Sequence, residues 1–381
     1  MAIIGDIQFF FILVFFAWLL TRLLLQHLFK KPTNPNLHLP PSPPAPPFIG
    51  HIHLLSSVVS KCFHNLSSKH GSLLYLRLGS RPLLVLKRSR GVRREGLRIF
   101  LHNLVEKAYK NEKVDEGLEL MKLTNNTVCR MVMSTRCTEE DDEAERCREL
   151  VEGSVALTGK LAVATTLGPL KKLGYWDLFI GGTDTAASTM QWMMAELINH
   201  PNVFKKLREE IKSVVGTTRP VEDSDILNLH YLQAVVKETL RLYPLVPAIP
   251  RECRQDCKVG GFDIPKETAV LINAYSIMRD PELWDNPNEF YPEKFLHEEE
   301  NQKKQNFNFV PFGGGRRKCL GSQLALCLMN ITVASMVRGF DWKFAAGDGQ
   351  KINMEAKAGM AMCMKHPLLC FPIIHFNPVS A

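Results

Sequence analysis

The pattern of apolar and polar positions predicts a membrane anchor at the N-terminus. Residues 9–20 form an unbroken apolar run, and mainly apolar residues extend it to position 29. About 20 such residues span the hydrocarbon core of a bilayer. Only Asp6 is charged before the run, whereas Lys30 and Lys31 follow it, which predicts that the rest of the chain is cytosolic. A cleaved signal peptide is the alternative, but no small-x-small cleavage site follows the run.

Proline dominates the segment after the apolar run. Six of the eight residues from Pro40 to Pro47 are prolines. This density excludes helix and favours extended polyproline geometry, so we predict a stiff hinge over residues 30–50. A disordered linker or a ligand for a proline-recognising domain is the alternative. The body of the protein is then expected over residues 51–381.

Periodicity within the body predicts a mainly α fold with a small β region. Apolar runs at 73–78 and 82–86 flank Gly79 and Ser80 and indicate a hairpin. Helical spacing of Val203, Leu207, Ile211 and Val214, with Pro201 at the start and Gly216 at the end, indicates a helix over 201–215. The same patterns predict a helical region over 91–160, helices over 178–198, 231–243 and 322–337, a hairpin turn at 259–262 and a strand over 268–272.

Composition narrows the classes of function. The chain has 381 residues, of which 45% are hydrophobic and 23% charged, which excludes wholesale disorder. Its formal charge of +8 is weak for a nucleic-acid-binding protein but suits anionic lipid or an acidic partner. Six basic residues within 87–98 have no interleaved aromatic residue, so we predict no nucleic-acid partner. Ten scattered cysteines argue against a disulfide scaffold and favour a reducing compartment.

A glycine-rich loop contains the most chemically distinctive cysteine. Three glycines and then three cations precede Cys319, and an apolar helical stretch begins at Ser322. Glycines let the backbone approach a flat partner closely, and cations and helix N-termini lower the pKa of a thiol. A thiolate is a suitable axial ligand for haem iron. A structural cysteine or a phosphate-binding loop is the alternative, although the G-K-[ST] ending of the latter is absent.

Two further motifs precede this loop. Glu238 and Arg241 are three positions apart in a predicted helix, so their side chains share a face and can pair. The sequence Gly-Gly-Thr-Asp-Thr at 181–185 introduces two glycines into a helix, each costing about 1 kcal/mol relative to alanine. Its hydroxyl and carboxylate groups, at Thr185 and Asp184, can hold and exchange protons. A surface turn capped by Asp184 or Thr183 is the alternative.

Together the motifs resemble those of the cytochromes P-450. The haem-binding signature F-x-x-G-x-R-x-C-x-G is matched at Phe312, Gly315, Arg317, Cys319 and Gly321. The resemblance implies that Cys319 ligates the iron of haem b and that Arg317 and Arg251 bind its propionates. It also implies an incomplete cytochrome P-450 fold, mainly α with a small β region, preceded by an N-terminal transmembrane helix.

The resemblance assigns roles to the other two motifs as well. Glu238 and Arg241 match the E-x-x-R of the family, which holds its structural core together. Asp184 and Thr185 match its oxygen-activation stretch, in which the carboxylate relays protons and the hydroxyl contacts dioxygen. One position departs from the family pattern, because Lys294 stands where the family has an arginine in P-E-R-F. Lysine cannot form the planar hydrogen-bonding fork of arginine.

Two blocks of the family are expected to be missing from this chain. Near 88–91 the family has a helix with W-x-x-x-R that holds a haem propionate, and the only such sequence here starts at Trp18 in the predicted anchor. Near 175–177 the chain passes directly into the oxygen-activation helix, where the family has the helices that cover the substrate. Both expected losses lie on the substrate side of the haem, and water exclusion there controls oxygen chemistry.

The resemblance is to plant members that hydroxylate flavonoids, pterocarpans or triterpenoids. It implies an oxidoreductase that inserts one oxygen atom from O2 into a small hydrophobic metabolite, with electrons from NADPH supplied through NADPH-cytochrome reductase. The expected location is the endoplasmic reticulum membrane, with a single-pass anchor in lipid and a cytosolic catalytic body. The alternative is a catalytically incompetent truncated, splice or gene-model product of the family.

Overall fold

The computed structural model describes residues 42–44, 51, 54, 66, 69, 73–78, 81–86, 89–133, 176–296, 308–347, 350–359 and 361–378. The chain divides into two compact units, Met1–Arg88 and Ser89–Ala381. The expected anchor and most of the expected hinge lie outside the described residues. Within the described ranges, no helix is long and apolar enough to cross a bilayer.

The described part of the first unit contains the predicted hairpin. Strands β1 (Leu73–Leu78) and β2 (Arg81–Leu86) pair antiparallel, with Leu73 opposite Leu86 and Leu78 opposite Arg81. Leu76 is fully buried. The hairpin expected from the two apolar runs is therefore confirmed, with the second strand beginning one residue earlier than predicted.

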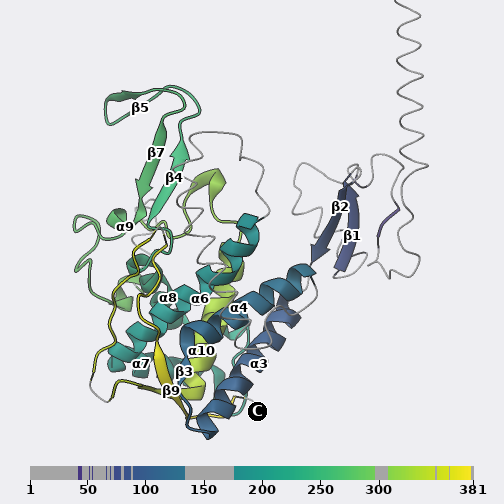
Figure 1. The fold of residues 1–381 in the computed structure, drawn as a ribbon, viewed down its shortest axis with the longest axis vertical. Helices are drawn as coiled ribbons and strands as arrows, with labels where there is room; N and C mark the ends of the chain where they lie inside the picture. Colours follow the sequence, from purple (N-terminus) through teal and green to yellow (C-terminus); the bar gives the residue numbers. More distant parts are fainter. Residues whose placement is uncertain are drawn as a thin grey trace, which may run out of the picture. The chain divides into compact units, whose positions relative to one another are not determined.

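Helices are the main elements of the described part of the second unit, as the sequence predicts (Figure 1). The predicted helical region over 91–160 is split by a short strand into two helices, and its part beyond residue 133 lies outside the described residues. The Gly-Gly motif does not interrupt its helix, which runs continuously through residues 181–185. The helices are α3 (Ser89–Tyr109), α4 (Glu116–Met133), α6 (Trp176–Asn199), α7 (Pro201–Val215), α8 (His230–Leu242), α9 (Ala274–Ile277) and α10 (Ser322–Gly339), together with the 3-10 turns η3 (Asp225–Asn228), η4 (Pro292–Phe295) and η6 (Gly315–Arg317).

Short antiparallel sheets complete the second unit. One sheet has the order β3 (Val114–Asp115), β9 (Leu369–Ile374), β8 (Phe340–Phe344). The other two are ladders of two strands, β4 (Ala248–Glu252) with β7 (Ala269–Asn273) and β5 (Cys257–Val259) with β6 (Phe262–Ile264). Gly260 and Gly261, with φ of 57° and 87°, form the predicted turn between β5 and β6. This backbone region strongly favours glycine.

The buried face of helix α7 differs from the predicted one at its last position, which is Val215 and not Val214. In α7 the buried side chains are those of Leu207, Ile211 and Val215. Val203 and Val214, which the sequence analysis placed on the same face, are only half-buried. Spacings of four residues place the stripe on one side of α7, and Val214 falls beside it.

Helix α6 passes through the centre of the core. Met190, Trp192, Met193 and Met194 are fully buried. The Trp192 ring stacks on Tyr243, with centroids 4.2 Å apart, and its Nε1 donates a hydrogen bond to the Met362 carbonyl at 2.8 Å. These contacts tie α6 to the end of α8 and to the C-terminal segment. They fix the two helices from which the candidate motifs project.

Candidate functional site

Backbone hydrogen bonds shape the cysteine loop. The Gly313 amide donates to the Val310 carbonyl at 3.0 Å, and the Cys319 amide donates to the Phe312 carbonyl at 3.0 Å. Gly313 and Gly315 have φ of 71° and 66°, which side chains with a Cβ rarely adopt. The loop therefore folds back on itself and presents Cys319, with an exposed thiol, just before the first residue of α10.

A cavity of about 430 Å³ opens in front of this thiol. Its wall is formed by parts of α4, α6, α8, β4, the cysteine loop and α10, all in the second unit. Much of the lining is aliphatic, and the volume is in the range of about 300–1,000 Å³ typical of ligand and cofactor sites. The predicted site residues on the wall are Thr185, Arg251, Phe312, Arg317, Cys319 and Gly321.

Four of the residues singled out in the sequence do not line this cavity. Gly315 begins the 3-10 turn η6 of the loop, while Glu238 and Arg241 lie on α8, which contributes Leu240 to the wall. Asp184 is also absent from the wall. The Ser188 hydroxyl lies 3.3 Å from Asp184 Oδ1. The structure therefore separates the two residues expected to act in oxygen activation: Thr185 lines the cavity and Asp184 does not.

Helix α6 contributes one face to the cavity and packs closely on α4 beside it. Thr185, Ala186 and Thr189 line the wall, and the Thr189 hydroxyl donates to the Thr185 carbonyl at 2.9 Å. A Cβ added to Gly182 would lie 3.4 Å from Val128 Cγ2 on α4. An added Cβ at this position would therefore make an ordinary van der Waals contact with α4.

Two guanidinium groups stand at the cavity. Arg251 projects from β4, and its Nη1 donates to the Pro250 carbonyl at 2.8 Å. Its Nη2 would lie 3.5 Å from a Cβ added to Gly313, so the arginine packs directly over the cysteine loop. Arg317, in the loop itself, also lines the wall. Guanidinium groups bind carboxylates through paired hydrogen bonds, so the pair suits a dicarboxylate ligand.

The Glu238–Arg241 pair of α8 is buried. Both side chains have no exposed surface, and their two hydrogen bonds measure 2.7 and 2.8 Å. Arg241 Nη1 also donates to the carbonyls of Met278 and Pro287 at 2.8 and 2.7 Å. Breaking such a pair by removing one partner leaves an uncompensated buried charge. The pair therefore holds α8 to the chain segment that precedes the cysteine loop.

Lys294 occupies the position of the expected arginine and joins the same network. Its Nζ lies 3.3 Å from Glu238 Oε1, and it donates to the carbonyls of Asn286 and Glu289 at 2.9 and 3.1 Å. Partial burial, partly offset by the charge of Glu238, lowers the pKa of Lys294. An ammonium group thus contacts three acceptors here without the planar fork of an arginine.

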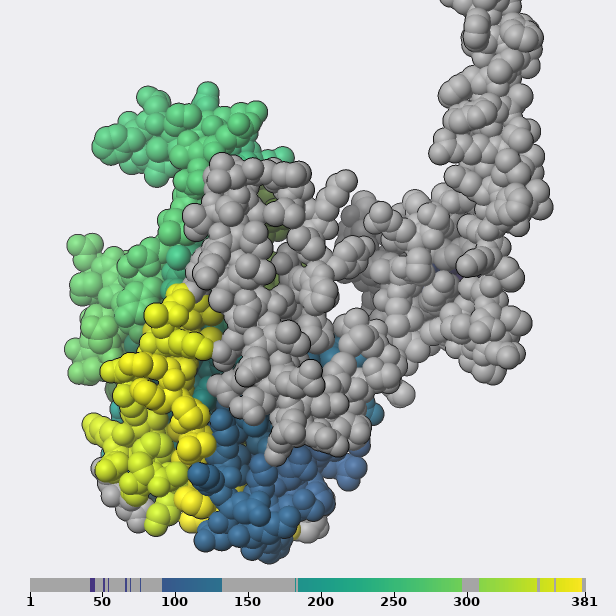
Figure 2. Space-filling model, viewed as in Figure 1, coloured from purple at the N-terminus to yellow at the C-terminus, as the bar shows by residue number. Residues whose placement is uncertain are grey.

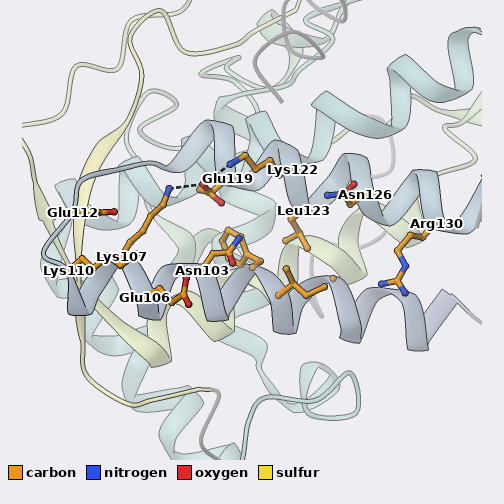
Figure 3. Close-up of a pocket in the computed structure, with 13 residues that line it drawn as sticks. Asn103, Glu106, Lys107, Lys110, Glu112, Glu119, Lys122, Leu123, Asn126 and Arg130 are labelled. Carbon is orange, nitrogen blue, oxygen red and sulfur yellow. Dashed lines mark hydrogen bonds and ion pairs between the residues drawn. The ribbon is translucent and has the colours of Figure 1, made fainter. Parts of the chain in front are cut away.

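A second cavity, of about 390 Å³, lies between α3 and α4 (Figure 3). Its wall is polar and charged: Glu119 pairs with Lys107 at 2.9 Å and with Lys122 at 3.1 Å. Arg130 also lines it, and Nη1 of this side chain is buried without a hydrogen-bond partner. No thiol and none of the predicted site residues lines this cavity, so it is distinct from the candidate cofactor site.

Several residues of the cofactor cavity were not predicted from the sequence. Thr127 and Val128 of α4 line it, as do Leu324, Ala325 and Leu328 of α10. The α10 residues follow an i, i+1, i+4 spacing, which marks a single helix face and was available in the sequence. The contribution of α4 depends on how this helix packs against α6, and no local pattern indicates it.

The residues of the first cavity fit haem b. An aliphatic wall accepts a large flat apolar ring, the Cys319 thiol can approach a metal at its centre, and two guanidinium groups can bind two carboxylates. Fold and cavity together define the class of a haem-thiolate protein.

Comparison with known proteins gives the family. A family model described as Cytochrome P450 matches residues 172–371, more than half of the chain. Cytochrome P450 705A22 of Arabidopsis thaliana is 34% identical over 507 residues, which cover 98% of this chain and 97% of that protein. The 3,9-dihydroxypterocarpan 6A-monooxygenase of Glycine max is 31% identical over 489 residues, covering 92% and 96%. The chain belongs to the cytochrome P450 family, whose members are haem-thiolate monooxygenases that use haem b.

The same comparison shows that this chain is internally shorter than its relatives. The alignment with the Arabidopsis protein extends over 507 residues, whereas this chain has 381. Because 97% of the relative is covered, more than a hundred of its positions within that span have no counterpart here. The expectation that internal blocks are missing is therefore supported.

Proposed function

We propose that this chain binds haem b through Cys319 and acts as a monooxygenase on a hydrophobic plant secondary metabolite. The proposed substrate class is a flavonoid, pterocarpan or triterpenoid, and the proposed electron source is NADPH through NADPH-cytochrome reductase. The observation that carries the proposal is the convergence of Cys319, Thr185, Arg251 and Arg317 on one largely aliphatic cavity. The pterocarpan monooxygenase among the relatives supports the substrate class.

Cys319 and the two arginines would hold the cofactor. Bound haem supplies the activation of O2 and the transfer of one oxygen atom, chemistry that protein side chains cannot perform alone. Cys319 lies three residues before the first residue of α10, and Arg316 and Lys318 are its close neighbours in the chain. Arg251 and Arg317 would orient the ring by binding its two carboxylates.

Thr185 and Asp184 of α6 would transfer protons to the reacting atoms. The Thr185 side chain lines the cavity, where a hydroxyl can accept a proton from one neighbour and donate to another. Asp184, one residue away and beside Ser188, would return protons from solvent to this hydroxyl. The separation of the two residues suits a relay in which only the hydroxyl faces the substrate.

The aliphatic part of the wall would select the substrate and exclude water. Leu245 and Val246, between α8 and β4, line the same cavity as Thr185, and so does Ile249 of β4. Apolar side chains favour a hydrophobic substrate and disfavour ordered water near the reacting atoms.

The location of the protein in the cell follows from its first fifty residues. We propose a single-pass anchor over 1–29 in the endoplasmic reticulum membrane, a proline-rich hinge over 30–50 and a cytosolic body over 51–381. The support is the apolar run and the two lysines that follow it. Contact with membrane lipid and with the reductase at the same membrane follows from this arrangement.

The test of the proposal uses the full-length chain supplied with haem. We expect one haem per chain and, after reduction under carbon monoxide, the red-shifted absorption band of a thiolate-ligated ferrous haem. Cys319→Ala should abolish that band. The control variant is Cys327→Ala, whose cysteine lies within α10, and it should retain the band. A chain without haem, or a band that survives Cys319→Ala, would refute the assignment.

The second candidate function is a catalytically incompetent product of the same family. The observation in its favour is the internal shortening relative to proteins that are otherwise covered almost completely. Incubation with reductase, NADPH, isotopically labelled O2 and a pterocarpan separates the two candidates. Incorporation of one labelled oxygen atom supports the monooxygenase, whereas bound haem without any product supports the incompetent form.

A further inference from the structure

Two thiols face one another where the β4–β7 ladder meets the β5–β6 hairpin. The Sγ atoms of Cys253 and Cys257 are 3.9 Å apart, and both cysteines are free. Three residues separate them in the chain. Closing to a disulfide bond of about 2.0 Å requires an approach of about 2 Å, which side-chain rotation in a short turn can supply.

Each cysteine is fixed to a different element. The Cys253 amide donates to the Thr268 carbonyl at 3.0 Å, and the Glu267 amide donates to the Cys253 carbonyl at 2.8 Å, which holds Cys253 at the end of the β4–β7 ladder. Cys257 is the first residue of β5. A bond between the two sulfur atoms would therefore link the hairpin to the ladder.

The pair is open to reagents in solution. Cys257 is exposed and Cys253 half-buried. The hairpin stands out from the body of the second unit, where it is the green projection in Figure 2. At its tip Val259 and Phe262 are 63% and 75% exposed. An oxidant of small size can therefore reach Cys257 directly.

We propose that Cys253 and Cys257 form a reversible, peroxide-responsive disulfide that fixes the hairpin against the strand carrying Arg251. The Cys257 thiolate attacks one oxygen of hydrogen peroxide, breaks the O–O bond and becomes a sulfenic acid, and the other oxygen leaves as water after protonation. The Cys253 sulfur then attacks the Cys257 sulfur, breaks its S–O bond and releases a second water. The two thiols lose two electrons in total, and the peroxide gains them.

The order of these two steps follows from the greater exposure of Cys257 and from the raised pKa of Cys253. Partial burial, together with the adjacent Cys257, raises the pKa of the Cys253 thiol. A thiol with a raised pKa is less often the attacking thiolate toward peroxide, so the exposed Cys257 is expected to react first. Cys253 then acts as the resolving thiol. A dithiol reductant would return both residues to the free state.

The disulfide has a consequence for the cavity, and this part rests on the proposed function. Arg251 belongs to β4 and lies two residues before Cys253, and Ile249 of the same strand also lines the cavity. Linking the hairpin to the ladder removes freedom of motion from the end of this strand. Exchange of the backbone amides of β4 and β7 with solvent should therefore slow in the oxidised protein.

Peptide mapping of the full-length chain tests the bond directly. Trypsin cleaves after Arg251, Arg254 and Lys258, which places the two cysteines in separate peptides. After treatment with hydrogen peroxide and alkylation of the remaining thiols, the proposal predicts that these two peptides are joined and that a dithiol reductant separates them. Cys253→Ser and Cys257→Ser should each abolish the joined species, whereas Cys327→Ser should leave it unchanged.

Two results would overturn the inference. One is the recovery of both peptides alkylated, or separately oxidised, under peroxide conditions that oxidise an exposed model thiol. The other, for the link to Arg251, is identical amide exchange of β4 and β7 in the oxidised and reduced wild type. Neither measurement needs bound haem, so a failure here is distinguishable from a failure of the proposed monooxygenase function.

Discussion

The cavity has two sides that are held in place by different means. We call the side with Cys319 the thiolate side, and the side with Thr185 of α6 the oxygen side, after the role proposed for Thr185. On the thiolate side, Arg241 and Glu238 form a buried ionic network, and backbone hydrogen bonds close the loop before Cys319. On the oxygen side, α6 is held by packing against α4, where Gly182 lies beside Val128. Polar networks are specified by a few residues, whereas packing depends on every neighbouring element.

The difference shows how internal shortening affects the two sides unequally. The expected losses near 88–91 and 175–177 border α3 and α6, and α6 together with α4 forms the oxygen side. The network around Glu238 is complete without them, since all its described partners lie between residues 238 and 294. We therefore expect haem attachment to be more robust than controlled oxygen chemistry.

The largest expected effects are those of substitutions on the two sides of the cavity, at Cys319 and at Thr185. Cys319→Ala should remove the thiolate spectrum of the haem-loaded protein entirely. Thr185→Ala should keep that spectrum and reduce the fraction of consumed NADPH that appears as oxygenated product, because it removes a proton donor and not the iron ligand. Absorption spectra and product yields measured on the same samples check this. A Thr185→Ala protein without the thiolate band would contradict the separation of the two sides.

The next largest effect is on the stability of the thiolate side. Glu238→Ala should destabilise the fold by about 3–5 kcal/mol, because it leaves the Arg241 charge buried without its partner. The exposed Glu209, which lies 4.0 Å from Lys205, is the matched control, and Glu209→Ala should change little. Urea unfolding of both variants checks the prediction. Equal stability of the two variants would show that the buried pair does not hold the core.

A pH effect is expected on the oxygen side, at the start of α4. Burial first, and then the charge of Asp115, raise the pKa of Glu116 to about 8, from 4.5 in the unfolded chain. Between these values the folded state keeps a proton that the unfolded state has lost, so stability falls as pH rises. At about 1.4 kcal/mol per pH unit, the free energy of unfolding should fall by about 2–3 kcal/mol between pH 5 and pH 7.

Urea unfolding at several pH values measures this loss. Glu116→Gln cannot ionise, so the decrease that Glu116 causes should be absent in that variant. The exposed Glu112 gives the control, since Glu112→Gln should keep the slope of the wild type. A wild type and a Glu116→Gln protein with parallel pH profiles would show that Glu116 does not keep its proton in the fold.

The smallest expected effect concerns the one departure from the family pattern on the thiolate side. Lys294→Met removes three hydrogen bonds to Glu238, Asn286 and Glu289, and should cost about 1–2 kcal/mol. Lys294→Arg restores the residue that the family has and should change stability by less than about 1 kcal/mol, because Arg241 and the Tyr291 amide already bind Glu238. Thermal unfolding of both variants checks the order. A larger loss in Lys294→Arg than in Lys294→Met would mean that the site is shaped for an ammonium group.

Features that depend on local sequence were predicted well. Gly260 and Gly261 marked their hairpin turn, Pro201 and Gly216 marked the ends of α7, and the spacing around Cys319 placed it just before a helix. These features follow from backbone freedom and hydrogen-bonding capacity of individual residues.

Features that depend on tertiary packing were not predicted. The spacing of Glu238 and Arg241 did not by itself indicate that the pair is fully buried. No local pattern indicated that Val128 of α4 borders the cavity or that Cys253 and Cys257 face each other. Burial of an i, i+3 ion pair depends on what covers the helix, and a C-x-x-x-C spacing does not determine whether two thiols meet. Such contacts require the arrangement of elements far apart in the sequence.

The most direct test of the account is X-ray absorption at the iron edge of the haem-loaded, full-length protein. The account predicts one sulfur atom in the coordination shell of the iron, lost in Cys319→Ala and retained in Cys327→Ala. A shell of nitrogen and oxygen atoms alone in the wild type, or a sulfur neighbour that survives Cys319→Ala, would contradict it.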